Sequence, residues 1–359
     1  MSAAATHELG QKPRGALWAS VDALIDRAPG VEDLLWHGLG PLAARRLRQR
    51  GEEPDARLVE KERTAALRVL GTPIVLERVR AACEGPLVLI KGYEVALLYG
   101  DPALRPFVDI DLLVEDSRGA QRALVNAGFV EVGKPELFTD IHHLRPVRLP
   151  ELPLPMTVEI HHVPKWPDLM VAPTTEELLA AAVPSSTQVD GISTLPPVHH
   201  ALILAAHSWA HLPLRRIQEL VDIALLAEPT SRAELDALAA RWELERVWQT
   251  TSGCIDSLFY GGPKTWAQRI WAQHLLEGRE RTVFESHVQR WVAAFWALPS
   301  YEAFPTLAAA VADEFTPGQD EGWREKNARM WRALRNAFVA RSEHDRELGP
   351  GAHRWRRRR

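Results

Sequence analysis

The chain has 359 residues, a formal net charge of −4 and an apolar content of 46%, which is enough for two or three domains with sizeable cores. A slightly negative chain lacks the clustered positive charge that tracks a phosphate backbone, so nucleic acid is not expected as the main partner. Cys83 and Cys254 provide neither a disulfide framework nor a zinc quartet. No apolar run reaches membrane-spanning length, and the N-terminus lacks a signal-peptide pattern. We expect a cytoplasmic protein with no membrane partner.

The first 82 residues are predicted to be helical. A polar stretch over 1–15 comes first, and apolar residues then recur at helical spacing from Leu17 onward. Further helices are expected over 41–50, 55–70 and 73–83. Residues 1–82 therefore form an N-terminal helical segment that leads into the first strand.

A sheet is expected to begin after this segment. The apolar, β-branched run over 87–90 predicts a strand that ends at Lys91 and Gly92. A short helix over 93–99 follows, and a second strand is expected over 108–114.

Two aspartates interrupt the second strand. Asp109 and Asp111 point to the same face because side chains alternate along a strand, while Val108, Ile110 and Leu112 point to the other, towards the core. Neighbouring carboxylates repel each other. The pair therefore indicates either a divalent cation held between them or an edge strand with a wet, polar face.

The next part of the chain continues the mixed pattern up to residue 195. The expected elements are a helix over 117–127, a strand over 129–132, an irregular loop over 135–150 that carries His142 and His143, a strand over 156–163, a helix over 174–183 and a short strand pair over 188–192. Glu159 and His161 share one face of the strand over 156–163.

From Pro196 onward the pattern is helical. After two helices over residues 196–228, further ones are expected over 231–242, 244–258, 264–277, 281–297, 302–315 and 321–341. His207 and His211 lie four residues apart on one helix face, a spacing that can bind Zn²⁺, but no glutamate stands between them as a general base. The chain ends in a basic tail over 346–359.

The first two strands and the segment between them contain four short motifs in this order: Ile90-Lys91-Gly92, Tyr99, Arg105-Pro106 and Asp109-Ile110-Asp111-Leu112-Leu113-Val114. In this order and spacing the chain resembles the uncharacterised nucleotidyltransferases of the polymerase-β-like superfamily. The resemblance implies an α+β fold: a small mixed-sheet nucleotidyltransferase core over 83–195, flanked by the helical segment 1–82 and an all-helical domain over 196–345.

The resemblance also implies the ligands. Asp109, Asp111 and Glu159 would form a carboxylate triad that binds a pair of Mg²⁺ (or Mn²⁺) ions and a nucleoside triphosphate. Most superfamily members carry Gly-Ser or Gly-Gly after the first strand, whereas this chain has Lys91-Gly92. Phosphate binding would then fall to backbone N–H groups at the helix start and to the lysine.

The roles of four further residues remain open. Glu159 is either the third metal ligand or an exposed strand carboxylate, and His161 either orients Glu159, contacts a phosphate or is a buried structural histidine. Arg105 either contacts a phosphate or lies on a surface loop. Asp222 either lines the nucleotide or acceptor pocket or makes helix-capping and interhelix hydrogen bonds.

These residues indicate an enzyme that moves a nucleoside monophosphate from a triphosphate to an unidentified small-molecule, peptide or protein acceptor. An alternative is a non-catalytic nucleotide-binding or regulatory module of the same fold. A third hypothesis is a metal-dependent hydrolase that uses the histidines at 142–143 and 161–162.

Overall fold

The computed structural model describes residues 14–133, 142–152, 156–167, 169–211, 214, 216–271, 282–317 and 321–340. The chain forms two compact units, Met1–Leu276 and Glu277–Arg359. The expected basic tail at 346–359 and most of the polar N-terminal stretch lie outside the described residues. The finer division at residues 82 and 195 stays a prediction.

The α+β fold is confirmed, because the first unit contains a seven-stranded mixed sheet in the order β3-β4-β5-β2-β1-β7-β6. Its strands are β1 Val88–Leu89, β2 Asp109–Leu113, β3 Val130–Glu131, β4 Val147–Arg148, β5 Thr157–His161, β6 Val183–Pro184 and β7 Ser193–Thr194. The longest strands, β2 and β5, lie side by side and run parallel, whereas β1 pairs antiparallel with β2. The pair expected over 188–192 is instead β6 and β7, which flank those residues.

Apolar side chains at alternate positions fix the orientation of β2 and β5. Ile110 and Leu112 on β2, and Val158 and Ile160 on β5, are almost completely buried in one hydrophobic cluster. Val108 was expected in this core but is half exposed, because it precedes the first paired residue of β2.

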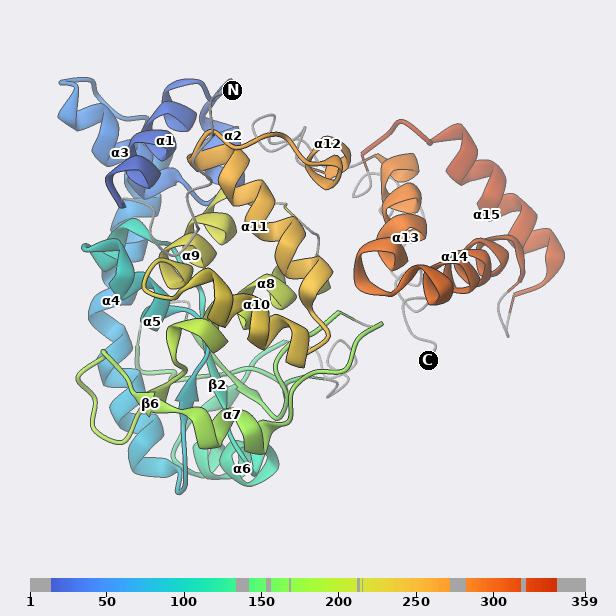
Figure 1. Cartoon of the computed structure of the whole chain (residues 1–359). Coiled ribbons are helices and arrows are strands. Elements are labelled where there is room, and N and C mark those ends of the chain that lie inside the picture. The colour runs from blue at the N-terminus through green and yellow to red at the C-terminus, as the bar shows by residue number, and fades with distance from the viewer. Residues whose placement is uncertain are drawn as a thin grey trace. The chain divides into compact units, whose positions relative to one another are not determined.

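The described part of the first unit contains twelve α-helices. Eight of these come before residue 212: α1 Arg14–Asp26, α2 Val31–Trp36, α3 Gly40–Gln49, α4 Ala56–Ala82, α5 Tyr93–Ala96, α6 Ser117–Asn126, α7 Thr175–Ala181 and α8 Pro197–His211. The others are α9 Ile217–Ala227, α10 Arg232–Arg241, α11 Glu245–Phe259 and α12 Trp266–Trp271. Figure 1 shows α8 packed together with α9, α10 and α11, while α4 runs along the sheet.

Helix α4 corrects one expectation, since the predicted helices over 55–70 and 73–83 form a single helix through Pro73. Proline removes one hydrogen bond from a helix interior and usually breaks it. Here Ala65 before the proline and Leu76 after it are both fully buried. Packing on both sides of Pro73 therefore outweighs the lost bond.

The second unit contains α13 Val283–Ala297, α14 Ser300–Phe315 and α15 Trp323–Arg335. These helices match the expected positions closely. Across the described parts of both units, no helix has the length and apolar character needed to cross a membrane.

Candidate functional site

The register of β2 and β5 places several polar side chains together. Asp109 pairs with Thr157, and Asp111 pairs with Glu159. His161 lies two residues beyond Glu159, so its side chain points to the same face. Asp109, Asp111, Thr157, Glu159 and His161 therefore share one face of two adjacent strands, which we call the polar sheet face.

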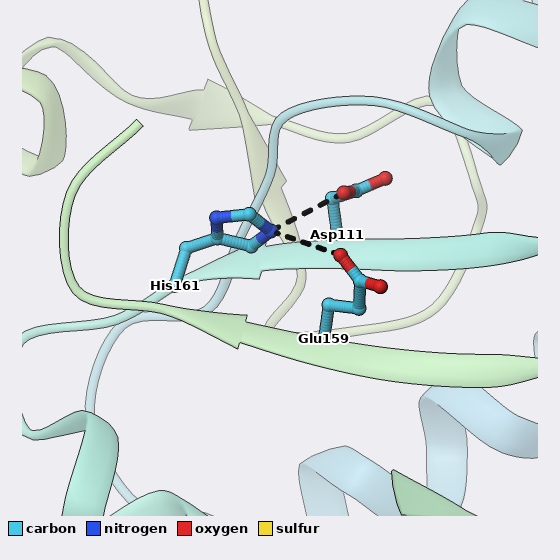
Figure 2. A group of neighbouring side chains, drawn as sticks. All are labelled: Asp111, Glu159 and His161. Atoms are coloured by element: carbon cyan, nitrogen blue, oxygen red, sulfur yellow. Dashed lines mark hydrogen bonds and ion pairs between the residues drawn. The ribbon is translucent and has the colours of Figure 1, made fainter. Parts of the chain in front are cut away.

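His161 lies between two of the carboxylates. Its Nε2 is 3.2 Å from Oδ1 of Asp111 and 3.7 Å from Oε2 of Glu159, and Figure 2 shows the imidazole pointing at both. Asp111, Glu159 and His161 each offer one ligand atom within 4.8 Å of the other two. Among the described residues this is the group that could hold a metal ion.

Asp109 is placed differently from the other two acids. Its Oδ1 accepts a hydrogen bond from the Thr157 hydroxyl at 2.6 Å, and it does not belong to the group of converging ligand atoms. Sequence reasoning missed Thr157, although it stands two residues before Glu159 on the same strand. Extending the strand alternation backwards from Glu159 would have found it.

The ionisable groups of this face have shifted pKa values. Burial raises the pKa of Asp111, but the Lys91 charge and the His161 contact outweigh it and hold the value well below the usual range. Burial raises the pKa of Asp109, and the charges of Glu159 and Asp111 add to that rise. Burial lowers the pKa of His161, but its bonds to Asp111 and Glu159 produce a net increase. Asp111 is therefore a carboxylate at neutral pH, beside an imidazole whose pKa is raised.

The turn at Lys91 and Gly92 borders the same face. Gly92 has φ of 71°, and an added Cβ would lie 2.6 Å from the backbone oxygen of Asp109, so no larger residue fits there without displacement. Lys91 Nζ lies 3.4 Å from Nε2 of His207 on α8, and the Lys91 charge lowers the pKa of both Asp109 and Asp111. The helix that follows, α5, has only four residues.

Arg105 and Asp222 form a buried ion pair, each with about 3% of its side chain exposed. Arg105 Nε and Nη2 donate to the two Asp222 oxygens at 2.8 and 2.7 Å, and Nη1 donates to the Gly92 carbonyl at 3.0 Å. The Tyr99 hydroxyl donates to Asp222 at 2.7 Å. This buried network of Tyr99, Arg105 and Asp222 connects α9 to the Gly92 turn.

Helix α8 also supports the end of β1. His200 Nε2 lies 2.8 Å from the carbonyl oxygen of Ile90, and burial lowers the pKa of His200 to about 4. His207 faces Lys91, whereas the side chain of His211 lies outside the described residues. The Zn²⁺ site that the spacing of His207 and His211 allows therefore stays a hypothesis.

His143 approaches the polar sheet face from the loop before β4. Its Nε2 is 3.7 Å from Oε2 of Glu159, and its ring centre is 5.1 Å from that of His161. The structure therefore brings one of the two expected loop histidines to the carboxylates.

The sequence model of a family described as uncharacterised nucleotidyltransferase matches residues 34–260, which is more than half of the chain. No curated protein and no solved structure matches the chain. The matched range contains the sheet, the polar sheet face, the Gly92 turn and the buried network. The chain belongs to the family of uncharacterised nucleotidyltransferases.

Proposed function

We propose that the protein transfers a nucleoside monophosphate from a nucleoside triphosphate to a small-molecule, peptide or protein acceptor, with Mg²⁺ or Mn²⁺ as cofactor. The observation that carries this proposal is the convergence of Asp111 and Glu159 beside Lys91, on a face where Asp109 also lies. In the transfer an acceptor nucleophile bonds to the α-phosphorus, and the bond from that phosphorus to the pyrophosphate oxygen breaks.

The donor set fits a divalent cation. Asp111 and Glu159 place carboxylate oxygens within 4.8 Å of each other, and carboxylate oxygens are the ligands that Mg²⁺ and Mn²⁺ prefer. Asp109 would add a third carboxylate once its pKa is lowered by the cation's charge. A bound cation would lower the pKa of an acceptor hydroxyl and neutralise charge on the leaving pyrophosphate.

Lys91 is the proposed phosphate-binding group. Its ammonium influences Asp109 and Asp111 electrostatically, so it lies on the side where a metal-bound triphosphate would sit. The Gly92 backbone approaches Asp109 closely enough to exclude a side chain, which keeps the turn against β2. An ammonium at a fixed turn is a suitable point charge for phosphate.

Arg105 and Asp222 are proposed to support this site indirectly, as a buried structural pair that holds the Gly92 turn in the fold. Three N–H groups of Arg105 are engaged inside the protein, with Asp222 and the Gly92 carbonyl as acceptors. His161 is proposed to orient Asp111 and Glu159, because its Nε2 faces both carboxylates.

Calorimetric titration tests the proposal. ATP, GTP, CTP and UTP are titrated with Mg²⁺ or Mn²⁺ into the native chain and into Asp109→Ala/Asp111→Ala. The control is Glu62→Gln, which removes a carboxylate from the exposed Arg48–Glu62 pair. Metal-dependent binding of one nucleotide, lost in the double variant and kept in the control, is expected. That nucleotide would then be used to screen acceptors for pyrophosphate release. Failure of the native chain to bind all four nucleotides would contradict the proposal.

A further inference from the structure

A short segment beside β5 carries a second histidine to the polar sheet face. Leu144 N–H donates to the Ile160 carbonyl at 3.0 Å, and His162 N–H donates to the His142 carbonyl at 3.1 Å. Between these bonds, His143 forms an antiparallel bridge with His161. Directly bridged residues place their side chains on the same face. The backbone alone therefore puts His143 beside the carboxylates.

One hydrogen bond determines which nitrogen of His143 carries its hydrogen. Nδ1 lies 2.7 Å from the Leu144 carbonyl oxygen, and a carbonyl oxygen can only accept, so Nδ1 is the donor. In the neutral ring, Nε2 then presents a lone pair. The 3.7 Å between Nε2 and Oε2 of Glu159 is too long for a hydrogen bond. Metal-binding histidines have this arrangement: one nitrogen donates to a backbone carbonyl and the other faces the metal.

His161 has the opposite arrangement. Its Nε2 faces Oδ1 of Asp111 at 3.2 Å, and a carboxylate only accepts, so here Nε2 carries the hydrogen. Its Nδ1 is buried and has no hydrogen-bond partner in the structure as described. Binding a metal through Nε2 would move the hydrogen to Nδ1 and leave a buried donor unpaired, which is unfavourable.

We propose that His143 is an additional ligand of the metal site through Nε2, next to Glu159, and that His161 is a positioning residue for Asp111 and Glu159. This inference rests on the proposed function, because it assumes the metal site given there. An imidazole ligand favours a divalent transition metal, whereas Mg²⁺ favours oxygen ligands. Of the two ions in the proposed function, the site therefore favours Mn²⁺.

The experiment measures Mn²⁺ binding to the full chain by electron paramagnetic resonance, with and without the nucleotide that calorimetry identifies. Pulsed measurements detect the hyperfine coupling of a directly bound nitrogen. The variants are His143→Ala and His161→Ala, and His142→Ala is the matched control. We expect nitrogen coupling in the native chain, the control and His161→Ala. In His143→Ala it should be lost, and Mn²⁺ affinity should fall by at least about tenfold, the smallest effect usual for removing even an outer-shell partner.

Three outcomes would overturn the assignment. Coupling that persists in His143→Ala but disappears in His161→Ala would identify His161 as the nitrogen ligand. Mn²⁺ binding that lacks nitrogen coupling and is lost in Asp111→Asn would leave the proposed function intact and make His143 an ion-pair partner of Glu159. No Mn²⁺ binding under either condition would remove both the assignment and the metal site.

Discussion

The polar sheet face and the buried network differ in how their charges are balanced, although Gly92 connects them. In the buried network Asp222 receives two hydrogen bonds from Arg105 and one from Tyr99. On the polar sheet face Asp111 and Glu159 converge, and burial together with the charges of these two carboxylates raises the pKa of Asp109. In the buried network the Asp222 charge is thus neutralised by a partner within the protein. On the polar sheet face three carboxylates lie together, and their mutual repulsion favours binding of a cation.

This difference separates supporting residues from binding residues. A buried carboxylate with matched donors stabilises the geometry around it, and removal of one partner leaves an uncompensated charge. A face with converging acids is balanced best by a cation from solution. Variants in the buried network should therefore weaken folding, and variants on the polar sheet face should weaken binding.

The largest expected effect on folding comes from Arg105→Ala. It leaves the Asp222 carboxylate buried without its cation, and such a loss typically lowers the free energy of unfolding by about 3–5 kcal/mol. Urea denaturation measures this change. The matched control is Arg48→Ala, because Arg48 also forms two hydrogen bonds with a carboxylate, that of Glu62, but at the surface. The control should lose less than about 1 kcal/mol, and equal losses in both variants would contradict the comparison.

A smaller, pH-dependent effect is expected from His200→Gln. Burial in the folded chain holds the pKa of His200 at about 4, below its ordinary value of 6.5. As pH falls below the higher value, the unfolded chain binds a proton that the folded chain does not, so stability is lost. Between pH 6.5 and 5 this amounts to about 2 kcal/mol. Glutamine keeps a donor for the Ile90 carbonyl but does not titrate.

The check is urea denaturation of both proteins at pH 7 and pH 5. The native chain should lose about 2 kcal/mol more than His200→Gln over this interval. Parallel losses in the two proteins would show that His200 is already cationic in the folded chain.

Tyr99→Phe should have the smallest effect. It removes one neutral donor from Asp222 and leaves both hydrogen bonds from Arg105 in place. The free energy of unfolding should fall by about 1 kcal/mol, as measured by urea denaturation. A loss as large as that of Arg105→Ala would mean that Tyr99, and not the charge pair, holds the network together.

Local patterns were sufficient to predict the elements that form the site. The alternation in β2 and β5 placed Asp109 with Asp111 and Glu159 with His161, because a strand's period is set by its own backbone. The Lys91-Gly92 turn was also found from sequence. The register that sets Asp111 beside Glu159 was not predictable, since it pairs two strands that are distant in the chain.

The buried network could not be predicted from the sequence, for the same reason. Arg105 and Asp222 are 117 residues apart, and no local pattern indicates that one neutralises the other. The sequence left Arg105 between a phosphate contact and a surface loop, whereas the structure buries it against Asp222. Similarly, Pro73 suggested two helices, and only packing on both sides shows why α4 continues.

The most direct test makes the same chemical change in both groups, carboxylate to amide. Glu159→Gln should lower the affinity for the metal–nucleotide complex by at least about tenfold and change the free energy of unfolding by less than about 1 kcal/mol. Asp222→Asn should lower the free energy of unfolding by about 3 kcal/mol or more, while the folded fraction keeps its nucleotide affinity within about threefold. Calorimetry and urea denaturation on both variants provide the four values. The reverse pattern, with binding lost in Asp222→Asn and folding lost in Glu159→Gln, would contradict the account.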